Sequence, residues 1–168
     1  EKTFDALTPK STNAADVARE DIQELIAHTG DQFSYKQLTN HLNNMPPRYP
    51  SQNSAQEVTQ HLRLIENLGK EPVGISVAPS GLFSEIIICT HDKPFRLSEI
   101  CGVLATNNIN IFSAQAYTRR DGIVIDVFQV TSPENTPEIS QDLQKGIEHT
   151  LIEVFREKVH VDELFAKY

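Results

Sequence analysis

Between residues 72 and 157 the hydrophobic pattern alternates between the period of a strand and the period of a helix, and this alternation leaves few possible folds. Apolar residues at every second position, or in a short unbroken run, predict strands, whereas apolar residues three and four positions apart predict helices. The strand patterns are 72–77, 82–90, 109–118 and 123–131, and the helix patterns start at Pro94 and Pro137. Asp121-Gly122 is typical of a hairpin turn between the last two strands.

Residues 82–157 therefore have the order strand, helix, strand, strand, helix. This βαββα order is one strand short of the ferredoxin-like βαββαβ unit. It predicts an α+β fold with an antiparallel sheet and both helices on one face. The apolar run 86–89 predicts that the first strand is buried on both faces. A second subunit, the N-terminal helices or a following domain would then cover the other face of the sheet.

The closing strand of the ferredoxin-like unit has no clear candidate after the last helix, because 158–161 is only a short run. In that unit the closing strand lies beside the first one. Residues 72–77 are joined to 82–90 by a short Pro-Ser-Gly turn, so we expect them to pair with that strand and fill the vacant edge. Otherwise the last strand is missing, or the edge is open to another chain and favours a homodimer through the sheet edge.

The first 70 residues predict a small helical segment. Ser34 with Gln37, and Ser54 with Glu57, have the spacing of a capping box, in which each side chain bonds the backbone N–H of the other residue. Apolar residues at helical spacing follow both boxes, and three prolines interrupt the chain between them. His61 lies beside the apolar stripe of the second helix, and we expect it to pack there.

Charge and composition disfavour several classes of function. The formal net charge is −8 and no stripe of Lys and Arg is present, so we expect no nucleic acid partner. No apolar run approaches the roughly 20 residues that span a bilayer, so no membrane segment is expected. Cys89 and Cys101 form no metal-type pair and fit reduced thiols in a cytoplasmic protein. The first residues show neither an initiator Met nor a signal-peptide pattern, which is typical of a piece of a longer chain.

His91 and Asp92 are adjacent, and a His-Asp pair is the metal-binding core of many phosphohydrolases. Such an enzyme needs further His and Asp ligands around its metal, but the other histidines show no companion spacing. An independent metal hydrolase is therefore disfavoured. Asp92 comes just before Pro94, so we expect it instead to cap the first turn of the following helix.

Four motifs carry a resemblance to a known family: a strand that ends in THDKP, followed by NINI, SAQAYT and RDGIVIDVF. With them, residues 83–133 resemble the first ACT domain of the bifunctional uridylyltransferase/uridylyl-removing enzymes that modify PII nitrogen-regulatory proteins. The upstream residues 45–65, MPPRYPSQNSAQEVTQHLRLI, are similar to the segment that joins the HD domain of those enzymes to their ACT region.

The resemblance implies a regulatory segment in nitrogen signalling. In this family a nucleotidyltransferase domain transfers UMP to PII, an HD domain removes it, and tandem ACT domains sense glutamine. The chain lacks the Gly-Ser and Asp-x-Asp pattern of the transferase, so the resemblance places it after both catalytic domains. It implies a helical linker segment at 1–70 and an ACT-like regulatory domain at 71–168, with no catalytic residue, metal or cofactor. The implied partners are the remaining domains of the parent chain and a PII-type protein as the substrate of that parent.

The resemblance also implies a ligand site, because ACT domains bind small molecules at the loop between the first strand and the first helix. The family pattern there is Asp-x-Pro-Gly-Leu. Asp92 and Pro94 match it, whereas Phe95 replaces the Gly and Arg96 the Leu. Gly permits close approach to the backbone; Phe95 removes that option and could fill the pocket itself. The residues expected around a ligand are Asp92, Phe95, Arg96, Leu97, Asn108 and Asn110.

Several alternatives stay open at this point. Arg96 would either pair with a ligand carboxylate or be a solvated charge on the helix surface. Asp126 lies in an otherwise apolar strand and must reach solvent or a partner, so we expect a cross-strand contact with Tyr117 or Arg119. If no small molecule binds, the segment is a dimerisation or interaction module.

Overall fold

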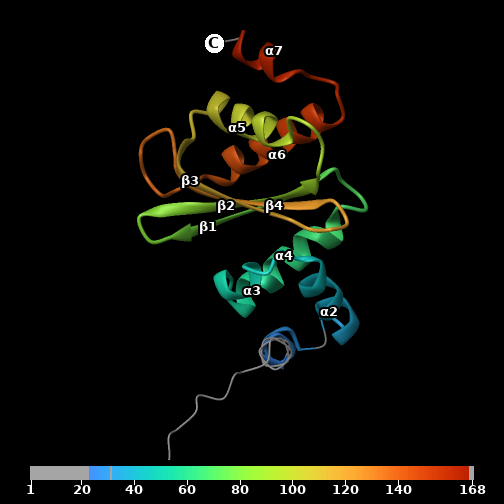
Figure 1. Ribbon diagram of the computed structural model, residues 1–168. Helices are drawn as coiled ribbons and strands as arrows, with labels where there is room; N and C mark the ends of the chain where they lie inside the picture. The colour runs from blue at the N-terminus through green and yellow to red at the C-terminus, as the bar shows by residue number, and fades with distance from the viewer. Residues whose placement is uncertain (1–22, 31, 167–168) are drawn as a thin grey trace, which may run out of the picture.

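A four-stranded antiparallel sheet separates two layers of helices in the computed structural model, which describes residues 23–30 and 32–166 (Figure 1). The strands are β1 (Val73–Ser80), β2 (Phe83–His91), β3 (Asn110–Thr118) and β4 (Ile123–Thr131). On one face lie α5 (Arg96–Thr106) and α6 (Gln141–Phe155), with α7 (Val161–Phe165) outside them. On the other face lie α2 (Tyr35–Asn44), α3 (Tyr49–Gln52) and α4 (Ala55–Asn67), and residues 23–29 are also helical. Within these residues no helix is both long and apolar enough to cross a bilayer.

The sheet has the order β1-β2-β4-β3, with every neighbouring pair antiparallel. The α+β fold and the βαββα order predicted for 82–157 are confirmed. β1 occupies the edge that the missing last strand would fill, with Val73 opposite Thr90 and Ser80 opposite Phe83. The prediction that 72–77 pair with the first strand is therefore confirmed, and the strand continues to Ser80.

Helix ends follow the sequence signals closely in the N-terminal layer and less closely elsewhere. Both predicted capping boxes form, at Ser34 and at Ser54. The prediction that Asp92 caps α5 is wrong. A turn closed by Arg96 N–H and Lys93 C=O comes first, so the helix starts at Arg96 and Asp92 lies too far upstream. The last long helix starts four residues after Pro137, because Ser140 serves as its N-cap.

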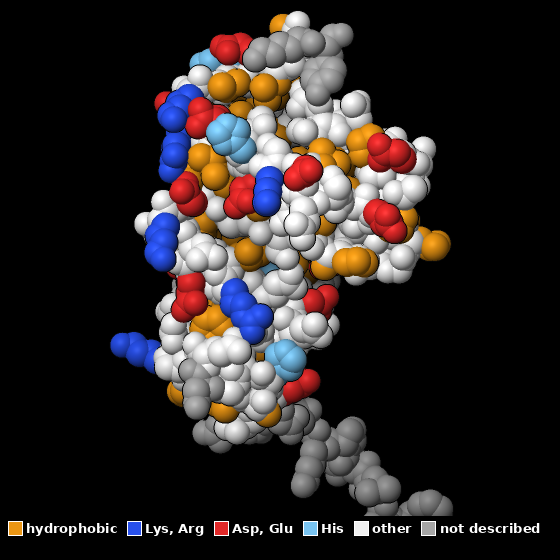
Figure 2. Space-filling view, turned by 180° about the vertical axis from the view of Figure 1, so that it is seen from behind, with side chains coloured by type: hydrophobic (Ala, Val, Ile, Leu, Met, Phe, Trp, Pro, Cys, Tyr) orange, Lys and Arg blue, Asp and Glu red, His pale blue; other side chains and the backbone are white. Residues whose placement is uncertain are grey.

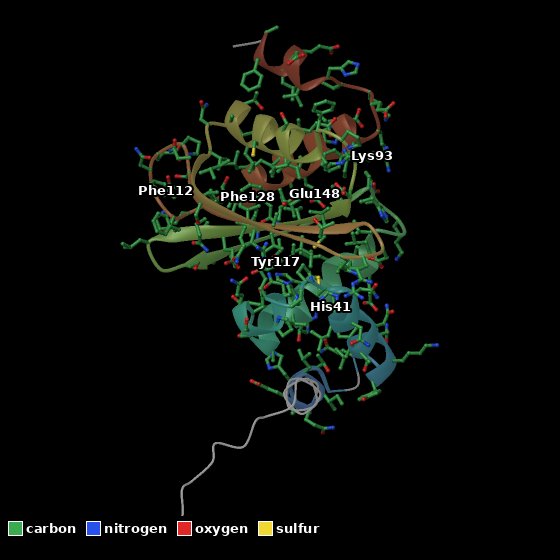
Figure 3. All side chains as sticks on the ribbon, viewed as in Figure 1. His41, Lys93, Phe112, Tyr117, Phe128 and Glu148 are labelled. Atoms are coloured by element: carbon green, nitrogen blue, oxygen red, sulfur yellow. The ribbon has the colours of Figure 1, made fainter. Side chains whose placement is uncertain are left out.

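Each face of the sheet carries its own apolar core, as the unbroken apolar run in β2 predicted. The two cores share β2 and β4, whose side chains alternate between the faces. In Figure 3, Phe128 points toward α5 and α6, whereas Tyr117 points toward the N-terminal helices. Ile86, Ile88, Ile100, Leu104, Phe128, Ile147 and Leu151 are in the first core, and Leu38, Tyr49, Val58, Leu62, Ile87, Cys89, Tyr117 and Ile125 are in the second. Among the candidates for covering the second face, the N-terminal helices are the ones that do so.

A glycine sets the closest approach between the sheet and the N-terminal helical layer. A Cβ atom at Gly74 in β1 would lie 2.7 Å from the backbone oxygen of Leu64 in α4. Real side chains do not tolerate this distance to backbone, so only glycine allows α4 to pack directly on β1. Gly102 of α5 likewise allows α7 to pack closely on α5, because a Cβ atom at this position would overlap the Val161 side chain of α7.

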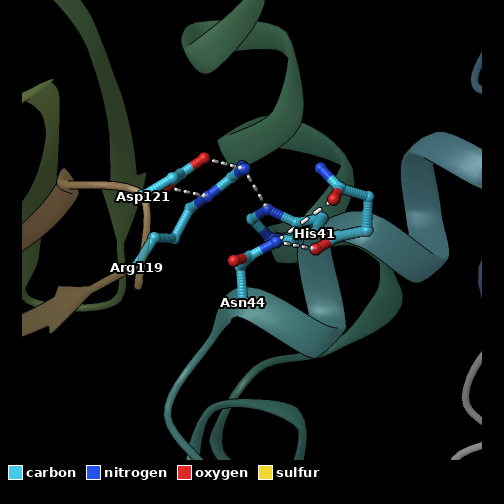
Figure 4. Close-up of polar contacts among 5 residues, drawn as sticks. His41, Asn44, Arg119 and Asp121 are labelled. Carbon is cyan, nitrogen blue, oxygen red and sulfur yellow. Dashed lines mark hydrogen bonds and ion pairs between the residues drawn. The ribbon is translucent and has the colours of Figure 1, made fainter.

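A chain of hydrogen bonds between buried side chains runs through the second core and joins the β3–β4 hairpin to three helices. Arg119 Nη1 lies 3.1 Å from His41 Nδ1 of α2, and His41 Nε2 lies 3.0 Å from the Tyr49 hydroxyl of α3. That hydroxyl lies 2.6 Å from His61 Nδ1 of α4. At its outer end Arg119 also forms an ion pair with Asp121, at 2.6 Å (Figure 4). We call Arg119, His41, Tyr49 and His61 the buried relay.

The direction of the protons in the buried relay follows from Arg119, whose guanidinium can only donate. His41 Nδ1 must therefore accept, so its Nε2 carries the proton and donates to Tyr49. The Tyr49 hydroxyl then donates to His61 Nδ1, which leaves the proton of His61 on Nε2. Burial and the Arg119 charge lower the pKa of His41 to about 3, and burial lowers the pKa of His61 to about 4. Both imidazoles are therefore neutral at neutral pH, as this order of donors requires.

Removing the Tyr49 hydroxyl should destabilise the protein, because it leaves His41 Nε2 and His61 Nδ1 without a partner. We expect Tyr49→Phe to lower the free energy of unfolding by about 2–3 kcal/mol, the usual cost of stranding buried polar groups. Chemical denaturation at pH 7 measures this. Tyr35→Phe is the matched control, since Tyr35 is 57% exposed. Equal stability of the two variants would contradict the role given to the buried relay.

Candidate functional site

The loop between β2 and α5, which the sequence singled out, has a strained residue at its centre. Phe95 is the N-cap of α5 with φ of 66°, in the left-handed region that favours glycine. The residue is 81% exposed, so its side chain fills no pocket among the described residues. The backbone conformation explains why the family pattern has Gly at this position, and Phe in its place costs about 1 kcal/mol or more.

Arg96 is turned away from the loop and packs inside the helical layer. Its guanidinium lies 3.8 Å from the centre of the Phe155 ring in α6, and its Nη1 pairs with Glu99 at 2.9 Å. Only 7% of the residue is exposed, so the interpretation of Arg96 as a solvated surface charge is wrong. In this conformation Nη1 is paired and the guanidinium plane is stacked, whereas Nε is buried without a hydrogen-bond partner among the described residues. Leu97, the next residue, is half exposed.

The six residues expected around a ligand fall into two groups at opposite ends of the sheet. Asp92, Phe95, Arg96 and Leu97 follow the end of β2. Asn108 lies just before β3 and Asn110 begins it, at the end of the sheet where β2 also begins. Asn108 follows Asn107, the C-cap of α5, and has φ of 55°. Asn110 Nδ2 bonds Asn135 Oδ1 at 2.9 Å and thereby holds the loop after β4. The structure therefore brings four of the six together.

A buried carboxylate, Asp126, lies in β4 on the face that α5 and α6 cover. It stands opposite Ile88 and Ala116 and is 3% exposed. The predicted contact with Tyr117 or Arg119 is wrong, because Tyr117 points to the other face and bonds Gln52, whereas Arg119 bonds Asp121 and His41. Burial, with a further contribution from the Asp92 charge, raises the pKa of Asp126 to about 6. Asp92 and Asp126 therefore make this end of the sheet acidic.

The residues that a metal hydrolase would need do not come together. No group of three or more His, Cys, Asp or Glu side chains that could hold a metal ion occurs in the part of the chain that the structure describes. The two cysteines are unpaired thiols. Burial and the nearby Asp126 raise the pKa of both, which makes them poor nucleophiles.

Side chains of both charges are mixed on the molecular surface. On the face shown in Figure 2, Lys and Arg lie mostly along one side and are interspersed with Asp and Glu. The sequence interpretation missed a set of buried, hydrogen-bonded polar side chains, which is the buried relay. The one sequence signal for the buried relay was the position of His61 beside an apolar stripe, and His61 is indeed buried. No local pattern indicated that His41 and Arg119 would be linked to it.

Replacing Asp126 by Asn should stabilise the protein at neutral pH. The pKa of Asp126 rises from its usual 3.8 to about 6 on folding, so the folded state binds the proton more tightly and loses this advantage as the pH rises through 6. We expect Asp126→Asn to gain up to about 3 kcal/mol in unfolding free energy at pH 7, and almost nothing at pH 4. Denaturation of both proteins across this range tests the sign. A gain that does not depend on pH would contradict it.

Comparison with known proteins finds a family match for part of this chain. The model of the ACT domain family matches residues 84–145. The match begins at Ser84, inside β2, and so leaves out β1, the strand that fills the vacant edge.

The similarity to individual relatives extends over more residues of this chain than the ACT match does. A bifunctional uridylyltransferase/uridylyl-removing enzyme of Idiomarina loihiensis is 25% identical over 116 residues, which are 67% of this chain and 13% of that protein. The enzyme of the same name from Rhodospirillum rubrum is 31% identical over 51% of this chain and 10% of its own length. The serine/threonine-protein kinase STY17 of Arabidopsis thaliana is 30% identical over 61% of this chain and 18% of its own length. The chain thus spans less than a fifth of these relatives, and its residues 84–145 are an ACT domain related to the ACT domains of the uridylyltransferase/uridylyl-removing enzymes.

Proposed function

We propose that the chain is the regulatory segment of a PII uridylyltransferase-like protein and that it passes a glutamine signal to nucleotidyltransferase and HD hydrolase domains elsewhere in the parent. The supporting observation is the similarity to several enzymes of this name, over 116 residues in one case against the 62 residues of the ACT match. A PII-type protein would be the substrate of the parent, in the cytoplasm. We propose no cofactor for this segment.

The β2–α5 loop offers groups that suit an amino acid. The N-cap of α5 makes no side-chain bond, so the backbone N–H groups of Leu97 and Ser98, which follow the already bonded N–H of Arg96, can donate to a carboxylate. Asp92 and Asp126 supply negative charge for an ammonium group. Because Arg96 is paired with Glu99 and stacked on Phe155, recognition of the ligand carboxylate falls to the helix N-terminus.

A second function, as a dimerisation or interaction module, is favoured by β3. This strand forms an edge of the sheet, and residues 110–116 are exposed on both of its faces. It has no charged residue and no proline, two of the features that usually protect an edge strand from pairing, although its register shifts between Ile111 and Ser113. A second copy of the chain could extend the sheet by antiparallel pairing along β3.

Glutamine should stabilise the chain if the loop is its site. At a concentration ten times Kd, binding adds about 1.4 kcal/mol, which raises the midpoint of thermal unfolding by roughly 3–6 °C in a protein of this size. We expect a shift with L-glutamine and none with D-glutamine. Phe95→Gly should enlarge the shift, because it opens the backbone and removes the left-handed strain, whereas Asp92→Asn should reduce it. If millimolar L-glutamine shifts the unfolding midpoint of neither the wild type nor Phe95→Gly, glutamine sensing by this segment is contradicted.

The interaction function has a separate test in sedimentation velocity. If β3 pairs with a second copy, the wild type should be dimeric at micromolar concentration, and Ala114→Arg on the exposed part of β3 should make it monomeric by placing like charges at the pairing edge. Ala105→Arg is the matched control, since Ala105 is also exposed but lies on α5. A monomeric wild type, or a dimer that survives Ala114→Arg, would contradict pairing through β3.

A further inference from the structure

A polar cavity of about 90 Å³ lies between the N-terminal helical layer and the sheet, remote from the β2–α5 loop. Its walls come from the end of α3 and the start of α4 on one side, and from β2, β3 and β4 on the other. A single water needs only about 10–15 Å³, so the cavity has room for a molecule of several heavy atoms.

Two carboxylates in the cavity wall give it a negative charge. Glu57 Oε2 accepts from the backbone N–H and the hydroxyl of Ser54, at 2.6 and 2.7 Å, which leaves Oε1 free. Glu85 Oε2 accepts from Gln129 at 3.1 Å and likewise keeps Oε1. Burial and the Glu57 charge raise the pKa of Glu85. No Lys or Arg lines the cavity, so neither charge is neutralised there.

His61 supplies an independent sign that a ligand belongs in this cavity. The residue is 1% exposed and lines the cavity, and its Nδ1 is occupied by Tyr49. The donor order of the buried relay, set by Arg119, leaves the proton on His61 Nε2. Within residues 23–30 and 32–166 no protein group bonds this N–H, and it is not among the polar atoms that are fully sealed from solvent, so it opens into the cavity. The cavity therefore presents two carboxylates and one buried donor.

We propose that this cavity binds a small organic cation that carries both a primary ammonium group and an oxygen acceptor, separated by about two carbons. The ammonium group would donate to the free oxygens of Glu57 and Glu85, and the oxygen would accept from His61 Nε2. Such a ligand relieves the repulsion between the two carboxylates and satisfies the unpaired N–H at the same time. The inference is independent of glutamine sensing, because it uses the other face of the sheet and none of the loop residues.

Ethanolamine is the smallest probe with both groups, and its binding can be followed by NMR of the whole chain at constant ionic strength. A molecule of four heavy atoms can gain at most about 6 kcal/mol, so its Kd is no tighter than about 40 μM. We expect saturable shifts at the His61 side chain and at the amides of Glu57 and Glu85. Ethylamine, which lacks the oxygen, should bind several-fold more weakly. Tetramethylammonium, which lacks N–H donors, should bind at least tenfold more weakly.

Charge-neutral variants separate the cavity from general attraction to an acidic protein. Glu57→Gln keeps the capping box, which accepts Gln as well as Glu, and Glu85→Gln keeps the partner of Gln129. Each should weaken ethanolamine binding about tenfold or more, whereas Glu134→Gln, an equal change of charge outside this cavity, should not. No saturable shift up to about 50 mM, or equal binding by the wild type and the Glu57→Gln/Glu85→Gln double variant, would overturn the proposal.

Discussion

The hydrogen-bonded path from Arg119 through His41 and Tyr49 to His61 is the interaction on which the two-sided architecture depends. β2 and β4 are apolar on both faces, so a bare sheet would expose Ile87 and Ile125 to water. The N-terminal helices prevent this, and apolar packing alone would allow them many positions. A buried polar chain tolerates only the arrangement in which every donor meets its acceptor, because a half-satisfied network is costly. The buried relay therefore fixes where α2, α3 and α4 sit on the sheet.

The β3–β4 hairpin connects this layer to the loop proposed to bind glutamine. At its turn, Arg120 N–H donates to Asn44 C=O at the end of α2, at 3.0 Å. On the other side Gly122 C=O accepts from Asp92 N–H at the end of β2, at 2.7 Å. One short turn thus contacts both the β2–α5 loop and the helices that precede the sheet. A ligand-dependent movement of the loop would reach the end of α2 by this route.

The fold could be predicted from the sequence where local patterns decide the structure, and not where distant residues meet. The strands, the β1 edge and both capping boxes follow from periodicity and from residues three positions apart. The start of α5 could not be predicted in this way. The helix begins only after a turn at Lys93–Arg96 in which Phe95 is left-handed, and the residue types there do not indicate that conformation. The burial of Arg96 on Phe155 and the buried relay depend on pairs 59 and 78 positions apart in the chain. No local signal could have placed the cavity between α4 and the sheet, since its walls come from five separate elements.

Native-state hydrogen exchange tests most directly whether the helical layer and the ACT sheet form one cooperative unit. The amides of Val58, Leu62 and Leu64 in α4 should open with the same free energy as those of Ile86 and Ile88 in β2, because the two elements share a core. Opening of α4 at a clearly lower free energy, with β2 still protected, would contradict this. The helices would then be a separable segment resting on an ACT domain that is stable without them.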